Sequence, residues 1–215
     1  MGSEMCIRDR FSYLAWPLYL ELTPEKQAKL KQNVTFYKIL PPSDVDIEDT
    51  TKKLEPYSPE NLYVWSRCLT KMRHEMEETC DARVFIGGRT RDFKGKCPGV
   101  LEEFLVALKY GHPIYLIGAF GGITKDILDA LDGKNPASFS EEYHFSNKQY
   151  ERMFHLYNEQ SPDTKIGYSA YLNSLKKLGF KGLSKLNGLS ESDNKRLAVT
   201  PVSYTHLTLP TTPYV

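Results

Sequence analysis

Apolar residues along this chain occur in two kinds of segment: short continuous runs, and longer segments in which they recur every three or four positions. A short continuous run rich in β-branched and aromatic residues is typical of a buried strand in a parallel sheet. We therefore expect strands at FSYLAWPLYL (11–20), VTFYKIL (34–40), ARVFIGG (82–88) and HPIYLIGAFGG (112–122). Pro17 and the pair Pro41-Pro42 should limit the first two, because proline cannot donate a ladder hydrogen bond.

The longer segments predict helices, because a spacing of three or four places apolar side chains on one helical face. Thr23 followed by Pro24 is typical of a helix start, and Thr124 is expected to cap another helix. Gly111 and Gly133 stand where helices commonly end. The predicted helices cover 23–33, 61–80, 99–111, 124–134, 146–160 and 168–180.

Strands alternate with helices over the first two thirds of the chain, which indicates βαβ units. The fold class predicted is α/β, a Rossmann-like parallel sheet flanked by helices, with a C-terminal helical extension over 135–198. We expect a single domain at 11–198. Trp16, Trp65 and Tyr115 are expected in its core.

Both ends of the chain differ from this pattern. Residues 1–10 lack the apolar stretch of a signal peptide, and 199–215 are rich in Thr and Pro without a helical period. Both resemble translated sequencing-adapter read-through, so we expect non-native tails; disordered native tails are the alternative. The domain between them is expected to be truncated at both ends.

Composition narrows the function classes. The chain has 215 residues, 40% of them hydrophobic and 26% charged, which is ordinary for a globular domain. A net charge of +1 gives no electrostatic reason to expect nucleic acid or a membrane surface as a partner. Four cysteines without metal-like spacing predict reduced thiols, no metal site and a cytoplasmic location.

Glycine pairs end two of the predicted strands, Gly87-Gly88 and Gly121-Gly122. In parallel α/β sheets ligands bind beyond the carboxyl ends of strands, near helix N-termini whose N–H groups suit phosphate. Glycine allows a ligand to approach the backbone closely. The pairs therefore predict ligand loops, with tight strand-to-helix turns as the alternative. Phe120 beside them is expected either in the core or stacked on a base.

Several motifs in order extend this hypothesis: MRHEM, DARVFIGGR, FKGKCPGVLEEF and GHPIYLIGAFGG. Together they resemble the SLOG superfamily, whose best-known enzymes are the LOG-type phosphoribohydrolases. The YLAWP run and the C-terminal NGLSESDNKRL are similar to the diverged SLOG domains of bacterial conflict systems. The resemblance implies a nucleotide or nucleotide-derived ligand and no required cofactor. An upstream strand and glycine loop of that fold are expected to be missing before Phe11.

The resemblance also implies residue roles. Arg73 and Glu103 take the positions of the arginine and glutamate that cleave the N-glycosidic bond in the enzymes. The implied ligand-binding residues are Gly87, Gly88, Arg89, Lys94, Gly95, Pro98, Gly99, Glu102, Gly118, Phe120, Gly121 and Gly122. The chain departs from the enzymes at Val100, which replaces a threonine, and by the basic insertion RTRDFKGKC. Arg73 also lies three residues before Met76, where the enzymes have a spacing of four.

Three hypotheses remain open. The first is a sensor domain for a NAD- or ADP-ribose-like signal in anti-phage or stress signalling, acting with a fused or adjacent effector and as a homo-oligomer. The second is a hydrolase of the nucleotide N-glycosidic bond. The third is a structural or oligomerising α/β module without a ligand. Val100 and the basic insertion favour the first over the second, whereas Glu103 and Arg73 keep the second open.

Overall fold

The computed structural model describes residues 10–30 and 33–199. These residues divide into two compact units, and the chain passes between them several times. The first unit holds the described part of 10–80 together with 93–97 and 144–166. The second holds 81–92, 98–143 and the described residues from 167 onward. The predictions for 1–9 and 200–215 lie outside the described residues.

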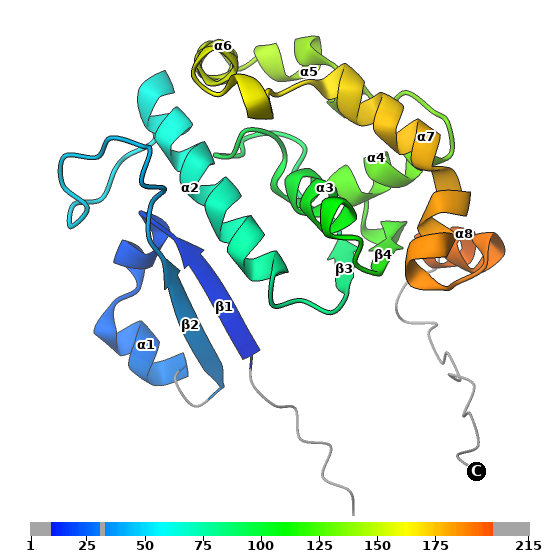
Figure 1. Cartoon of the computed structure of the whole chain (residues 1–215), viewed down its shortest axis with the longest axis horizontal. Coiled ribbons are helices and arrows are strands. Elements are labelled where there is room, and N and C mark those ends of the chain that lie inside the picture. Colours follow the sequence, from blue (N-terminus) through cyan, green and yellow to red (C-terminus); the bar gives the residue numbers. More distant parts are fainter. Residues whose placement is uncertain (1–9, 31–32, 200–215) are drawn as a thin grey trace, which may run out of the picture. The chain divides into compact units, whose positions relative to one another are not determined.

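The first unit begins with a βαβ element. Strand β1 (Arg10–Ala15) pairs in parallel with β2 (Val34–Ile39), and the chain between them includes helix α1 (Pro24–Leu30) (Figure 1). The Thr23 hydroxyl accepts a hydrogen bond from Lys26 N at 3.3 Å, which confirms the predicted helix start. The β1 strand ends before the Trp16-Pro17 bond, as the proline indicates.

Helix α2 (Pro59–Glu77) packs against β1 and against α6 (Lys148–Gln160) in the same unit. Its apolar side meets a core in which Trp16 and Trp65 are 1% and 0% exposed, so both tryptophans are core residues as predicted. Each indole donates a hydrogen bond to the long loop 40–58: Trp16 to Thr50 O and Trp65 to Leu54 O, both at 2.8 Å. The core thus also fixes a segment without regular structure.

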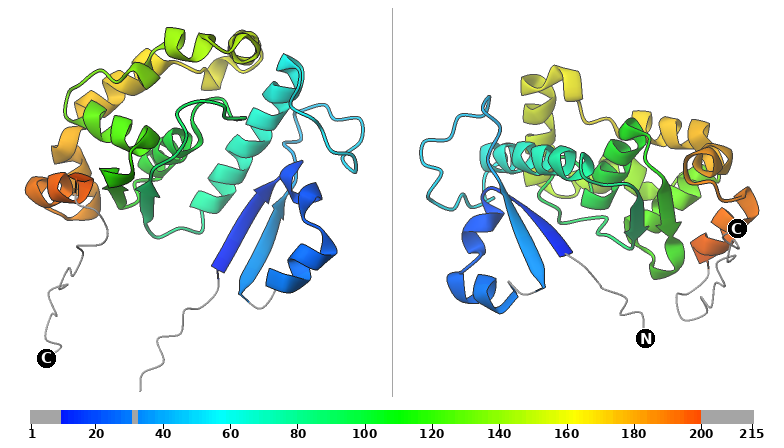
Figure 2. Two further views of the ribbon diagram at one scale, coloured as in Figure 1. Left: turned by 180° about the vertical axis from the view of Figure 1, so that it is seen from behind. Right: turned by 60° about the horizontal axis from the view of Figure 1, so that its bottom comes forward.

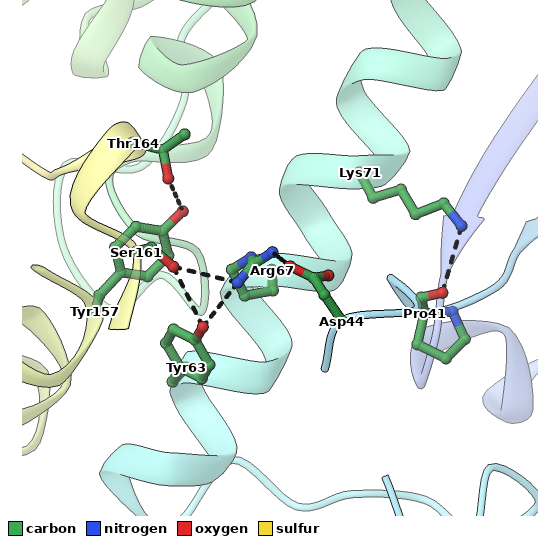
Figure 3. Close-up of polar contacts among 8 residues, drawn as sticks. All are labelled: Pro41, Asp44, Tyr63, Arg67, Lys71, Tyr157, Ser161 and Thr164. Atoms are coloured by element: carbon green, nitrogen blue, oxygen red, sulfur yellow. Dashed lines mark hydrogen bonds and ion pairs between the residues drawn. The ribbon is translucent and has the colours of Figure 1, made fainter. Parts of the chain in front are cut away.

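A polar network on α2 adds a second attachment for this loop (Figure 3). The Arg67 guanidinium donates to Tyr63 Oη at 2.7 Å, to Ser161 Oγ at 3.2 Å and to Asp44 Oδ2 at 2.5 Å. Lys71 Nζ donates to Pro41 O at 3.3 Å. Arg67 therefore joins the loop, α2 and the C-terminal end of α6 within the first unit.

The second unit is a further βαβ element with helices added after it. Strands β3 (Arg83–Ile86) and β4 (Ile114–Ile117) pair in parallel and are joined through α3 (Gly99–Tyr110). A short 3-10 turn at 118–120 then leads into α4 (Gly122–Leu131). Phe85 on β3 and Leu116 on β4 are 3% and 1% exposed, so one face of this pair forms the core.

Further helices follow α4 along the chain. In the short α5 (Glu141–Phe145), the residues up to Tyr143 belong to the second unit and those from His144 belong to the first. Helix α7 (Tyr168–Asn187) packs against α4, and α8 (Glu191–Val199) packs against α7 and β4, as the coloured segments in Figures 1 and 2 show. The α/β class, the parallel strands and the C-terminal helices are as predicted. Among the described residues the strands form two separate two-stranded sheets, one in each unit.

Among the helix boundaries that differ from the prediction, two have a clear cause. Thr124 is not an N-cap, because α4 already begins at Gly122 after Gly121, whose φ of 67° turns the chain. The helix predicted to end near Phe180 continues to Asn187, with a break at Gly179 where φ is 55° and ψ is −178°. Helix α8 has no clear apolar period and was not predicted from the sequence.

Candidate functional site

The two glycine pairs lie together at the carboxyl ends of β3 and β4. Ile123 N donates to Gly88 O at 3.1 Å, and Thr124 N donates to Gly87 O at 2.9 Å. A Cβ added at Gly122 would lie 2.2 Å from Gly88 O, closer than any real contact. The glycines therefore allow two backbone segments to touch. This close approach explains part of the glycine pattern without a ligand.

The start of α3 joins the same place. A Cβ added at Gly88 would lie 2.8 Å from both Val100 Cγ2 and Ile123 Cγ2. Val100 is in the first turn of α3 and Ile123 is in the first turn of α4. The N-terminal ends of the two helices thus converge on Gly88, and a Val100 methyl occupies the position where the family resemblance leads us to expect a hydroxyl.

The two helix starts differ in the donors they present. Two first-turn N–H groups of α4 are used by the carbonyls of Gly87 and Gly88. In α3, by contrast, the N–H groups of Gly99, Val100 and Leu101 have no acceptor among the residues that the structure describes. Since unaccepted N–H groups and the helix dipole favour an anion, α3 is the helix start that suits phosphate.

Glu103 is held by a partner that the sequence analysis missed. Arg83 Nη2 donates to Glu103 Oε2 at 2.5 Å, and the two side chains are 12% and 25% exposed. The Arg83 guanidinium carbon lies 5.3 Å from the centre of the Phe85 ring. Residues two apart on a strand share a face, so Arg83 could have been placed beside α3 with Phe85. Glu102, the acid in the first turn of α3, is 1% exposed.

Arg73 belongs to the first unit, whereas Glu103 belongs to the second. Arg73 lies on α2 and is 6% exposed. It is therefore not a solvated helix charge, the alternative that its sequence position suggests. Glu77, four residues further along the same helix, is 0% exposed, and the sequence analysis did not single it out.

The basic insertion is divided between the units. In the second unit Arg89 is exposed, Thr90 Oγ1 lies 3.0 Å from Tyr143 Oη, and the Arg91 guanidinium carbon lies 4.0 Å from that ring's centre. In the first unit Lys94 Nζ lies 4.2 Å from the centre of the Trp65 ring. Gly95 is buried there, while Pro98 returns to the second unit. Lys94 and Gly95 are thus assigned to a different unit from the glycine pairs.

Phe120 and Gly118 follow β4 and have opposite surroundings. Phe120 is 58% exposed, so it is not a core residue, and its ring is available for stacking. A Cβ added at Gly118 would lie 2.4 Å from Ala198 O. The close approach of α8 therefore explains Gly118, and it places the NGLSESDNKRL segment against the end of β4.

Amide side chains fix that C-terminal segment. Asn187 Nδ2 donates to Ile114 O at 2.7 Å and to Asn194 Oδ1 at 2.8 Å, and Leu189 N donates to Asn187 Oδ1 at 3.0 Å. Both asparagines are buried. The segment between α7 and α8 is thereby tied to the start of β4.

Comparison with known proteins identifies the family. The family model described as SLOG cluster2 matches residues 5–197. The chain therefore belongs to the SLOG cluster2 family, which confirms the resemblance of its motifs to the SLOG superfamily. The match begins within the segment predicted to be a non-native tail. Searches of curated proteins and of solved structures found no match.

Across residues 10–30 and 33–199, no group of three or more His, Cys, Asp or Glu side chains is placed to hold a metal ion. No helix within these ranges is long and apolar enough to cross a membrane.

Proposed function

We propose that this chain binds a nucleotide or nucleotide-derived small molecule at the carboxyl ends of β3 and β4. The observation that carries the proposal is the convergence of two helix starts on Gly88. One of these starts, α3, has first-turn N–H groups without acceptors among the described residues. Donors of this kind beside parallel strand ends are suited to a phosphate group.

Two exposed side chains supply further contacts in the proposal. Arg89 directly follows Gly88, and Phe120 directly precedes Gly121, so both leave the backbone near this edge. An arginine holds phosphate or ribose oxygens through charged hydrogen bonds. An aromatic ring stacks on a base, a contact worth about 1–3 kcal/mol. The arrangement therefore favours a ligand with both a phosphate and a base.

Within this class, a NAD- or ADP-ribose-like signal is the ligand that we propose. Membership of the SLOG cluster2 family supports it, together with the resemblance to SLOG domains of bacterial conflict systems. The biological role proposed is that of a sensor domain in anti-phage or stress signalling. It would act as a homo-oligomer and with an effector domain that is fused or encoded nearby.

The ion pair of Glu103 favours binding over cleavage. A carboxylate that stabilises an oxocarbenium-like state must face the sugar. Here Glu103 Oε2 accepts a hydrogen bond from Arg83 at 2.5 Å. A phosphoribohydrolase is therefore the second candidate, and base release from nucleoside monophosphates by the wild-type chain and by Glu103→Gln distinguishes it. Release that is lost in Glu103→Gln would replace the sensor proposal with the enzyme.

The test of the sensor proposal is a thermal-shift and calorimetry panel of AMP, ADP, NAD, ADP-ribose and its cyclic form. A ligand at 100 times its dissociation constant stabilises the fold by about 2.7 kcal/mol. Arg89→Ala and Phe120→Ala should each weaken binding by about tenfold or more. Arg152→Ala and Tyr57→Ala are matched controls, because both residues are exposed and lie in the first unit.

The controls decide what the panel means. Binding weakened by Arg89→Ala and Phe120→Ala, with both controls unchanged, supports the proposed location. Binding that survives both variants places the ligand elsewhere and contradicts it. Absence of binding by every member of the panel would favour the third hypothesis, a structural module.

A further inference from the structure

Helix α7 carries an unusual concentration of charge. Its twenty residues include four lysines and neither aspartate nor glutamate. Three of these lysines line a surface groove of about 590 Å³ beside Leu108 of α3. The complete lining is Leu108, Ser174, Lys177, Leu178, Lys181, Gly182 and Lys185, all of which belong to the second unit.

The charge of this groove is not compensated. Lys177, Lys181 and Lys185 are exposed and make no ion pair or hydrogen bond with another residue in the described ranges. The fourth lysine, Lys176, donates instead to Asn135 Oδ1. The chain as a whole has a net charge of only +1, so three unpaired cations in one groove are a local feature and not the result of a basic protein.

Within the lining of the groove, Leu178 packs closely against Gly182. A Cβ added at Gly182 would lie 2.4 Å from Leu178 Cδ1, so the absence of a side chain at Gly182 leaves room for that leucine. Lys181 and Lys185 are one helical turn apart, a rise of about 6 Å. Lys177 lies before the Gly179 break, and the groove brings it to the same surface. Lys181 and Lys185 therefore follow the helix as a row, and Lys177 lines the same groove.

We propose that this groove is a second anion site, which binds a small molecule carrying a chain of phosphate groups. A row of cations matches a linear polyanion, whereas a single orthophosphate meets fewer of the three ammonium groups. The volume lies in the range of small-molecule sites, and the Ser174 hydroxyl supplies a neutral donor. Lysine is a common phosphate-binding residue that acts as a point charge.

This site is distinct from the one at the strand ends. Its residues come from the C-terminal part of α3 and from α7, and it contains none of the glycine pairs, Arg89 or Phe120. Ligand binding at the two places is therefore separable by mutation. The lysine variants should leave nucleotide binding unchanged, and Arg89→Ala should leave polyphosphate binding unchanged.

The experiment is calorimetric titration of the full chain with sodium tripolyphosphate in about 50 mM salt, because higher salt screens the lysine charges. We expect one site per chain. Affinity should fall about tenfold or more when salt is raised to about 200 mM, because several ion contacts are lost. Orthophosphate should bind at least about tenfold more weakly, because it meets fewer charges.

Charge reversal locates the site. Lys181→Glu combined with Lys185→Glu should weaken tripolyphosphate binding by about tenfold or more, and the corresponding glutamine pair should give a smaller loss. The matched control is Lys26→Glu with Lys29→Glu, which makes the same charge change on exposed lysines of α1. Circular dichroism and the unfolding midpoint confirm that each variant is folded.

Several results would overturn the proposal. They are absence of tripolyphosphate binding, an equal loss in the Lys26 and Lys29 control, and loss of binding in Arg89→Ala. Equally tight binding of a single-stranded oligonucleotide with the same dependence on Lys181 and Lys185 would assign the groove to nucleic acid instead.

Discussion

Alanine at Gly88 should destabilise the protein far more than alanine at the neighbouring Gly87. Both glycines have a positive φ, 63° at Gly87 and 89° at Gly88. Their surroundings differ, because a Cβ at Gly87 has no described atom within 4 Å, whereas one at Gly88 would lie 2.8 Å from Val100 Cγ2 and from Ile123 Cγ2. Gly87→Ala therefore adds backbone strain alone, and Gly88→Ala adds strain and overlap.

The magnitudes follow from these two contributions. A left-handed backbone at a residue with a Cβ costs about 1–2 kcal/mol. Overpacking against two side chains adds about 1–3 kcal/mol. Gly88→Ala should thus lower the free energy of unfolding by about 2–5 kcal/mol, and Gly87→Ala by about 1–2 kcal/mol. For a chain of this size each kcal/mol lowers the melting temperature by about 2–4 °C.

Urea denaturation of both variants measures this difference, and a double-mutant cycle identifies its source. Val100→Ala removes one of the two methyl groups that a Cβ at Gly88 would meet. In that background Gly88→Ala should cost less, with a coupling of at least about 0.5 kcal/mol. Equal losses for Gly87→Ala and Gly88→Ala, or strict additivity with Val100→Ala, would refute the packing of α3 and α4 on Gly88.

Three further predictions concern other parts of the fold. The hydrogen bond from Arg67 lowers the pKa of Asp44. This pair therefore stabilises loop 40–58 fully at pH values above the unfolded pKa of about 3.9, and the stabilisation is lost as pH falls through the lower folded pKa. Asp44→Asn should remove that pH dependence from the hydrogen-exchange protection of the loop; an unchanged acid profile would contradict it. Burial raises the pKa of the Cys68 thiol to about 12, so iodoacetamide should not modify Cys68 in the folded protein at about pH 8. Alkylation of Cys68 detected by mass spectrometry would contradict this, because it would show that the surroundings of the thiol open to solvent. Asn187→Ala should lower the free energy of unfolding by about 1–3 kcal/mol, measured by denaturant unfolding, because the buried carbonyl of Ile114 loses its side-chain donor. A loss well below about 1 kcal/mol would show that the amide is dispensable.

Local signals in the sequence were sufficient to predict several helix boundaries and strands of the fold. The start of α1 at Pro24 follows from a capping threonine and a proline at the first helical position. The end of α3 at Gly111 follows from a glycine with a φ of 75°. Strands β3 and β4 follow from short apolar runs. The expected burial of both faces is wrong for β3, where Val84 and Ile86 are 58% and 48% exposed. Each of these signals acts within a few residues, so a single sequence reveals it.

Features that depend on distant residues could not be predicted in the same way. Thr124 does not cap α4 as predicted, because its N–H group lies within the first turn of that helix. The carbonyls of Gly87 and Gly88, more than thirty positions earlier in the sequence, accept hydrogen bonds from this first turn. Gly118 is explained by Ala198, which packs against it from the last described helix. The partner of Glu103 is Arg83, a residue of the adjacent strand.

The basic insertion RTRDFKGKC is a further feature that the sequence alone could not place. Its cations suggest one phosphate loop, but Arg89 and Lys94 belong to different units. Lys94 lies over the Trp65 ring instead, a contact that no local pattern indicates. Side-chain chemistry alone therefore identified candidate residues, while the grouping of those residues required the tertiary structure.

The most direct test of the proposed ligand site is an NMR titration of the ¹⁵N-labelled chain with ADP-ribose. We expect saturable shifts at the amides of Gly87, Gly88, Gly99, Val100 and Gly121, since these surround the proposed phosphate position. Amides of α1 and α6 should remain unchanged. Saturable shifts confined to other segments, or no shifts with any nucleotide of the panel, would contradict the central claim.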